Sequence, residues 1–254
     1  MGQDFDFLGR TALVTGAASG IGAATARWLA DRRLSRLVLV DRDEAGLAAL
    51  ALPCDVLCIP GDVADEALWQ RVESEAGPLH HAVLNAGIAA GASITDMSFA
   101  EWRRLQSVNL DGMFLSLRCA LRLLGDGGSV VMTASVSGLK AEPDTASYGA
   151  SKAGVMQLGR VAAKESAGRR IRVNVIAPGG VDTPIWDQTP FFQQMMDQHG
   201  GDRDAAMAAL SSMATPLGRF ASSAEVAGQI GFLLSDMAAS ITGTVLVSDG
   251  GYLL

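Results

Sequence analysis

Tyr148 and Lys152 are four residues apart in a segment with helical spacing, so their side chains share one face of the expected helix. A tyrosine phenol has a pKa near ~10 and is a poor base at neutral pH, but a neighbouring lysine cation lowers that pKa. Such a tyrosine can take a proton from an alcohol or donate one in the reverse direction. Tyr-x-x-x-Lys pairs also occur on ordinary solvated helix faces. Here, Ser135 at the end of an upstream apolar run favours the catalytic interpretation.

Three glycines follow the first apolar run, Thr11–Thr15, in the pattern Gly16-x-x-x-Gly20-x-Gly22. A strand that turns sharply into a helix beside a pyrophosphate must exclude side chains at the turn. The helix N-terminus then offers N–H groups and a positive dipole end to the anion. Glycines alone would also fit an ordinary tight turn. Their position directly after the first strand favours a nucleotide site.

Polar residues also follow the next three strand-like runs. Asp41 ends the second run, where a carboxylate can accept hydrogen bonds from both ribose hydroxyls of NAD, although a lone Asp closing a strand is common. Asp62 and Val63 follow the third run, and Asn85–Gly87 follow the fourth. The carboxyl-end loops of an open parallel sheet line one crevice, where ligands bind. These positions therefore support one another as parts of a single site.

The elements that must position these residues alternate along the whole chain. Seven short apolar runs, mostly without alternation, are typical of strands covered on both faces: Thr11–Thr15, Leu37–Val40, Val56–Ile59, Ala82–Leu84, Ser129–Thr133, Ile171–Ile176 and Thr244–Val247. The segments with helical spacing are 20–32, 43–51, 64–76, 100–124, 147–168 and 222–235. This alternation predicts an α/β fold: a doubly wound, seven-stranded parallel sheet of Rossmann type with helices on both faces. We expect one domain over residues 1–254.

Residues 184–216 break the strand–helix rhythm. They contain Pro184, Pro190 and Pro216, with Trp186, Phe191, Phe192, Met195 and Met196 among polar residues. We expect a covering flap with short helices; a surface loop packed on the core is the alternative. The large apolar side chains would fit either an apolar pocket under the flap or the flap's own core.

The bulk composition excludes several classes of function. A net charge of −7 is a poor match to nucleic acid, whose phosphates require basic patches. No apolar stretch approaches the ~20 residues of a membrane span, and the polar, acidic start Met1–Asp6 lacks signal-peptide features, so we expect a cytoplasmic protein. Cys54, Cys58, Cys119 and the histidines His80, His81 and His199 have no partners at metal-ligand spacing. We therefore expect reduced thiols and no catalytic metal.

Together these residues resemble the short-chain dehydrogenase/reductase family, in its single-domain branch of about this length. The match covers nearly the whole chain in family order: Thr15–Gly22, Asn85–Gly87, Asn109, Ser135, Tyr148–Lys152, Pro178–Thr183 and Ser248–Gly251. Leu84 stands where many members have a first asparagine, but Asn85 is retained. Residues 129–135 lack the two adjacent serines of many members, and the register assigns Ser135 rather than Ser137.

The resemblance implies a role for each matching position. Ser135 would hydrogen-bond the substrate oxygen, and Tyr148 would be the general acid/base. Lys152 would lower the Tyr148 pKa and bind the nicotinamide ribose, while Asn109 would hold a water that relays protons. The other positions would bind the cofactor: Gly16, Ser19, Gly20, Ile21 and Gly22 at the phosphates and ribose, Asp41 at the adenosine ribose, Asp62 and Val63 at the adenine, Asn85, Ala86 and Gly87 along the crevice, and Pro178, Val181 and Thr183 at the carboxamide.

The resulting hypothesis is an NAD-dependent oxidoreductase that transfers hydride between a secondary alcohol or ketone and the nicotinamide. Asp41 favours NAD, although Arg42 can pair with the 2′-phosphate of NADP. One alternative is a reductase of acyl thioesters bound to a carrier protein; such relatives usually use NADPH and often carry basic residues near the glycine loop. The other is a nucleotide-sensing regulator, which would not need the complete Asn109, Ser135, Tyr148 and Lys152 set.

Segments 100–124 and 147–168 are apolar beyond one stripe. A helix that is apolar on several faces is usually buried on several faces. The resemblance implies that these two helices pair across a two-fold axis to give a homotetramer or dimer.

Overall fold

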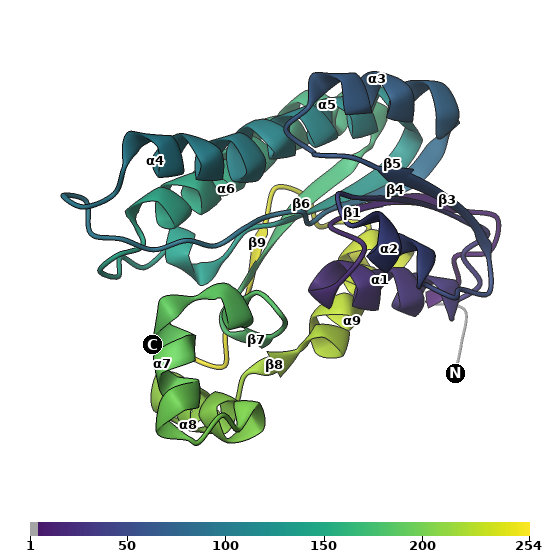
Figure 1. Ribbon diagram of the computed structural model, residues 1–254. Coiled ribbons are helices and arrows are strands. Elements are labelled where there is room, and N and C mark those ends of the chain that lie inside the picture. Colours follow the sequence, from purple (N-terminus) through teal and green to yellow (C-terminus); the bar gives the residue numbers. More distant parts are fainter. Residues whose placement is uncertain (1–4) are drawn as a thin grey trace.

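The computed structural model in Figure 1 describes residues 5–254 and contains one seven-stranded sheet. The strands are β1 (Thr11–Thr15), β2 (Arg36–Asp41), β3 (Asp55–Pro60), β4 (Leu79–Leu84), β5 (Leu124–Thr133), β6 (Arg172–Pro178) and β9 (Val245–Ser248). All are parallel, in the order β3-β2-β1-β4-β5-β6-β9. The order reverses between β1 and β4, which creates the crevice where such sheets bind ligands. The expected doubly wound fold is thereby confirmed.

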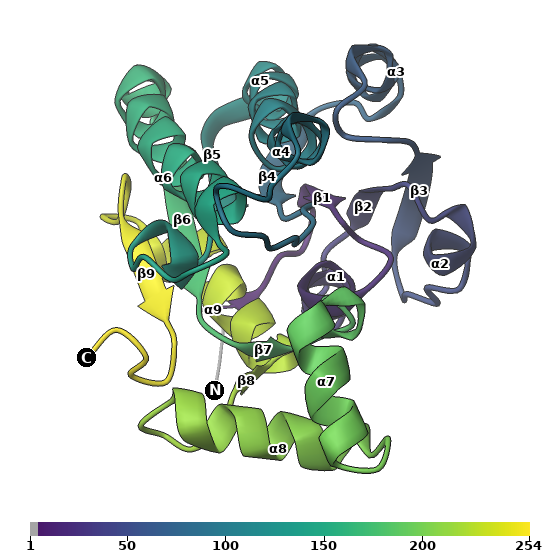
Figure 2. The ribbon, with the colours of Figure 1, turned by 60° about the vertical axis from the view of Figure 1, so that its left-hand side comes forward.

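Helices cover both faces of the sheet, as Figure 2 shows. One face carries α1 (Gly20–Ala30), α2 (Glu44–Ala48) and α9 (Ser223–Leu234); the other carries α3 (Glu66–Glu75), α5 (Gly112–Leu123) and α6 (Ala146–Ser166). Along β2, Val38 and Val40 enter one core while Leu37 and Leu39 enter the other. Both faces are buried, which explains why the strands read as continuous apolar runs.

The expected helix over 100–124 is divided by a wider turn. It consists of α4 (Phe99–Gln106), a π-helical turn (Ser107–Asp111) and α5. Such turns are commonly found at functional sites because they redirect a side chain within a continuous helix. Here the turn contains Asn109, one of the predicted site residues.

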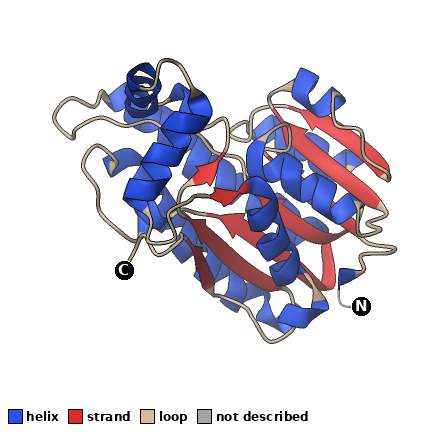
Figure 3. Cartoon of the chain, turned by 90° about the horizontal axis from the view of Figure 1, so that it is seen from below, coloured by secondary structure: helices blue, strands red, loops and turns tan. Residues whose placement is uncertain are grey.

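The flap forms its own small unit at one end of the sheet (Figures 1 and 3). It contains α7 (Pro190–Gln198) and α8 (Arg203–Ala214), and short strands β7 (Val181–Asp182) and β8 (Ala221–Ser222) pair at its base. Phe192 and Met195 are buried among residues of α8, so they belong to the flap's own core. Short helices therefore occur within the predicted flap segment. Most of the flap's large apolar side chains form this core, but Phe191 is exposed.

Candidate active site and cofactor crevice

The glycine loop between β1 and α1 has no room for side chains at two positions. Gly16 has a φ of +65°, and a Cβ there would lie 2.9 Å from the Ala86 Cα. A Cβ on Gly22 would lie 1.9 Å from the Gly16 carbonyl oxygen. The Thr15 hydroxyl accepts hydrogen bonds from the N–H groups of Asn85 (2.9 Å) and Ala86 (3.1 Å). The loop and the turn after β4 therefore form one rigid wall.

The N-terminus of α1 opens into this crevice. Ser19 is the exposed N-cap residue, and no side-chain cap from it is present in the described structure. The first N–H groups of the helix are then available to an anion, as pyrophosphate binding requires. A Cβ on Gly20 would lie 3.4 Å from Thr183 Cγ2, so the glycine loop also meets the segment after β6. This tight loop, which has no side chains at its three glycines, fits a dinucleotide.

Asp41 is held firmly at the end of β2. Its carboxylate accepts hydrogen bonds from Ala18 N (2.9 Å) and Asp43 N (3.0 Å), one on each oxygen. Each carboxylate oxygen retains a further lone pair for a ribose hydroxyl. Arg42 is exposed. The predicted ribose-binding carboxylate is thus fixed beside the glycine loop.

The loop after β3 holds the predicted adenine residues. The Asp62 carboxylate accepts a hydrogen bond from Ala64 N (2.9 Å), which forms a local turn. Val63 is buried, and a Cβ on Gly112 would lie 2.8 Å from Val63 Cγ2. The start of α5 therefore packs closely against this loop and fixes its position.

Tyr148 and Lys152 lie in the first turns of α6, and Ser135 follows β5. The Lys152 Nζ is 5.6 Å from the centroid of the Tyr148 ring and donates to the Thr133 carbonyl oxygen (3.1 Å). Ser135 Oγ accepts a hydrogen bond from Ser137 N (3.2 Å), so the hydroxyl is fixed at the start of a short 3₁₀ turn. The structure therefore gathers the predicted acid/base group, cation and hydroxyl at the carboxyl end of the sheet.

Burial dominates the electrostatics of this trio. It raises the pKa of the Tyr148 phenol, and a hydrogen bond with the Ser135 hydroxyl opposes that shift. Burial lowers the pKa of the Lys152 amine to about 8. The net shift of the Tyr148 pKa is opposite to the one expected from the sequence, because desolvation of the phenolate outweighs the other effects on this group in the protein alone.

Asn109 projects from the π-helical turn toward the same place. Its side chain accepts from Ile88 N (2.8 Å) and donates to the Ile88 carbonyl oxygen (2.9 Å). A Cβ on Gly87 would lie 3.3 Å from both Asn109 Oδ1 and Lys152 Nζ. Gly87 therefore lies beside both the amide and the amine, with little space for a larger residue.

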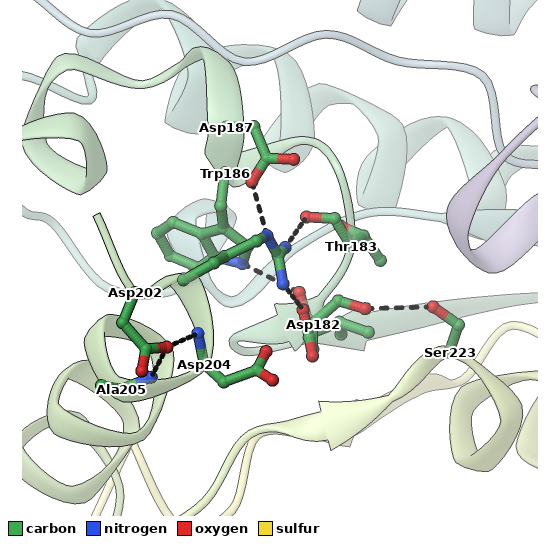
Figure 4. Close-up of polar contacts among 10 residues, drawn as sticks. Asp182, Thr183, Trp186, Asp187, Asp202, Asp204, Ala205 and Ser223 are labelled. Carbon is green, nitrogen blue, oxygen red and sulfur yellow. Dashed lines mark hydrogen bonds and ion pairs between the residues drawn. The ribbon is translucent and has the colours of Figure 1, made fainter. Parts of the chain in front are cut away.

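The segment after β6 forms the remaining wall of the crevice. Pro178 ends β6, and Gly179 N donates to the Ser248 carbonyl oxygen (2.9 Å). Val181 and Thr183 are buried, and the Val181 carbonyl oxygen accepts from Trp186 Nε1 (2.8 Å). Figure 4 shows Asp182, Thr183 and Asp187 close together at the start of the flap.

Two contacts in the site were not predicted from the sequence. The Thr133 group that binds Lys152 is a main-chain carbonyl, which any residue type would supply. Thr15 was marked only as part of a motif, although its position directly before Gly16 could have identified it as the link to Asn85. The three histidines stay outside the site, and no group of metal-ligating side chains occurs among residues 5–254.

Comparison with known proteins identifies the family. A family model described as "Enoyl-(Acyl carrier protein) reductase" matches residues 16–253. The chain is 40% identical to cis-4-hydroxycyclohexanecarboxylate dehydrogenase of Sinomonas cyclohexanicum over 97% of each chain.

Solved structures agree with this relationship. L-sorbose reductase from Gluconobacter frateurii, complexed with NADPH and L-sorbose, is 28% identical, with a TM-score of 0.89 over 99% of both chains. Carveol dehydrogenase from Mycobacterium avium, in complex with NAD, is 27% identical, with a TM-score of 0.89 over 97% of this chain and 98% of its own. The chain therefore belongs to the short-chain dehydrogenase/reductase family of oxidoreductases, which act on CH–OH substrates with a nicotinamide cofactor.

Proposed function

We propose that this protein is an NAD-dependent dehydrogenase that transfers hydride between a secondary alcohol or ketone and the nicotinamide. The observation that carries the proposal is that Ser135, Tyr148 and Lys152 lie together at the end of the sheet that also carries the glycine loop. The alternative of a non-catalytic nucleotide sensor has no use for a buried amine and phenol at the same place.

The side chains perform the proton chemistry. In alcohol oxidation, Tyr148 accepts the hydroxyl proton while Ser135 donates a hydrogen bond to the same oxygen; in ketone reduction, Tyr148 donates the proton. Lys152 is mostly protonated at neutral pH, because its pKa is about 8, and its charge favours the phenolate. Asn109 fixes the Ile88 backbone beside Lys152, where a water relay would begin. A bound nicotinamide supplies the hydride acceptor or donor.

The preference for NAD rests on Asp41. Two backbone N–H groups hold its carboxylate, so it resists turning away from a 2′-phosphate. That phosphate carries a charge near −2 and would meet a fixed negative charge at short range. NAD instead gains hydrogen bonds from its ribose hydroxyls to the carboxylate.

The substrate we propose is a secondary alcohol or ketone on a six-membered carbon ring. The relative from Sinomonas cyclohexanicum is named for such a substrate and matches along nearly the whole chain. Reduction of a carrier-bound acyl thioester is the second candidate, because the matching family model carries an acyl-carrier description.

The free thiols Cys54, Cys58 and Cys119 support a cytoplasmic location, and the single sheet spanning β1 to β9 supports one domain over 1–254.

The test is a substrate screen that follows NADH absorbance. The purified protein is assayed with NAD and cis-4-hydroxycyclohexanecarboxylate, simpler cyclohexanols and acyclic secondary alcohols, and with a 3-oxoacyl thioester plus NADPH or NADH. We expect turnover of ring alcohols with NAD. Turnover of the thioester alone would favour the second candidate, and binding of NADH without turnover of any of these compounds would favour a sensor.

A further inference from the structure

Arg203, the first residue of α8, binds three groups at the start of the flap. Its Nε donates to the Asp187 carboxylate (2.9 Å), one terminal nitrogen donates to the Asp182 carboxylate (2.9 Å), and the other donates to the Thr183 carbonyl oxygen (3.3 Å). The dashed lines in Figure 4 mark these contacts at Asp182, Thr183 and Asp187. One planar guanidinium thus joins the start of the flap to its second helix.

The segment that Arg203 holds forms a wall of the cofactor crevice. Thr183 is buried, and its side chain lies next to Gly20: a Cβ added there would be 3.4 Å from Thr183 Cγ2. The Thr183 carbonyl oxygen accepts from both Arg203 and Trp186 N, while Trp186 Nε1 donates to Val181. The conformation of the backbone beside the glycine loop is therefore fixed partly from the flap.

Arg203 pairs with two carboxylates at once, so its loss would change the start of the flap more than the loss of a single surface ion pair. Asp182 and Asp187 meet at one guanidinium, so without it two carboxylates would repel each other there. The turn between α7 and α8 contains Gly200 and Gly201, both at positive φ, and Arg203 follows it directly. Arg203 also lies 5.7 Å from the centroid of the Phe192 ring, which connects the charge cluster to the flap core.

We propose that Arg203 is a positioning residue for cofactor binding: it holds Val181–Asp187 in the conformation that receives the nicotinamide end. This inference rests on the proposed function, because it requires the nicotinamide to lie beside Thr183. It implies that Arg203 affects ligands that contain the nicotinamide and leaves the adenosine end of the crevice unchanged.

The experiment compares two ligands on one variant. Arg203→Met and the wild-type protein are titrated calorimetrically with NADH and with ADP-ribose, which lacks only the nicotinamide. We expect the Kd for NADH to rise about five- to twentyfold, which is the range for losing partly exposed charge-assisted hydrogen bonds. The Kd for ADP-ribose should stay within about twofold of the wild-type value. The control is Arg219→Met, which removes a similar paired arginine, bound to Glu225, from the exposed loop before β8.

An unchanged NADH affinity, or equal weakening of both ligands, would overturn the proposal. If Arg203→Met does not fold by circular dichroism, Asp187→Asn decides, because it removes one carboxylate charge and leaves Arg203 paired with Asp182. That variant should weaken NADH binding about two- to fivefold and spare ADP-ribose; equal effects on the two ligands would again overturn the proposal. A wild-type protein that binds ADP-ribose and NADH equally, or neither, would instead contradict the proposed function.

Discussion

Tyr148 is the residue through which the proton passes in the proposed reaction. Tyr148→Phe removes the hydroxyl and keeps the ring that packs near Lys152. We expect turnover to fall by roughly two orders of magnitude or more, the upper part of the range for a general acid/base, with NADH binding retained. Steady-state kinetics and a binding titration measure the two effects. A variant with more than about a tenth of wild-type turnover would show that another group carries the proton.

Asp41 governs the choice between the two cofactors. Its fixed carboxylate should give NAD an advantage over NADP of roughly a hundredfold in kcat/KM, or ~2.7 kcal/mol. Asp41→Ala should reduce this preference sharply and leave the exposed Arg42 to favour NADP. The measurement is kcat/KM with both cofactors for each protein. Equal efficiency in the unmutated enzyme would assign control of the ribose site to Arg42.

Individual residues of the site were predictable where a side chain carries the chemistry. Tyr148 and Lys152 share a helix face because of their spacing, and Gly16 and Gly22 were identified by their place after a strand. The Thr183 and Thr133 carbonyl contacts were not predictable, because a main-chain oxygen leaves no trace in residue type. Arg203 was also missed, since its partners Asp182 and Asp187 become neighbours only when the flap folds back.

At the scale of elements, His81 joins β4 to β5 and to the end of α9. The Ser129 hydroxyl donates to the Leu234 carbonyl oxygen (3.0 Å), so it accepts from the Nδ1–H of His81 (2.8 Å). Burial, first of all, and nearby cations such as Arg10 lower the pKa of His81 to about 3. The imidazole is therefore neutral in the folded protein across the physiological range.

This pKa predicts how stability responds to acid. Between pH 6.5 and about 3 the unfolded chain binds a proton at His81 that the folded protein does not, so the free energy of unfolding falls as pH decreases. The slope from one such proton is about 1.4 kcal/mol per pH unit. His81→Asn should remove this contribution in urea melts between pH 6.5 and 4, while His80→Asn, at the less buried neighbour, should remove less. An unchanged slope for His81→Asn would place the acid sensitivity elsewhere.

Element types followed from periodicity, but some boundaries did not: β5 begins at Leu124, five residues before the expected start at Ser129. The strands and helices were predictable because each buried strand is a continuous apolar run and each helix has an apolar stripe. The π-helical turn at Ser107–Asp111 was not, since its residues also fit a regular helix. The wider turn is accompanied by two hydrogen bonds between the Asn109 side chain and the Ile88 backbone, a tertiary contact that local sequence does not encode.

At the scale of the whole molecule, the outer face of α5 and α6 carries an apolar groove. Its lining residues are mostly aliphatic or aromatic: Leu110, Asp111, Phe114, Leu115, Gly154, Gln157, Leu158 and Val161. Phe114 and Val161 are 47% and 41% exposed. This groove is a suitable surface for the expected pairing of α5 and α6 between copies of the chain. We propose that a homodimer or homotetramer forms through it.

Light scattering tests this assembly. The wild-type protein at micromolar concentration should have two or four times the monomer mass, and Phe114→Asp should reduce it, because a charge would be buried at the two-fold contact. Met213→Asp, at an exposed residue of α8, is the matched control and should not change the mass. A monomeric wild-type protein would contradict the proposed interface.

The π-helical turn between α4 and α5 also makes chain length at this point as important as residue identity. On one side of it Gln106 donates to the Ser147 carbonyl oxygen; on the other Met113 and Leu117 enter the core. Because the π-helical turn takes up one extra residue, removing one residue from Ser107–Asp111 would restore a regular helix and keep both halves close to their present orientation, whereas the same deletion inside α4 or α5 would rotate one half by about 100°. A one-residue deletion in the turn would therefore leave the core positions of α5 in register and displace mainly Asn109, so the length of the chain here matters for the site more than for the core.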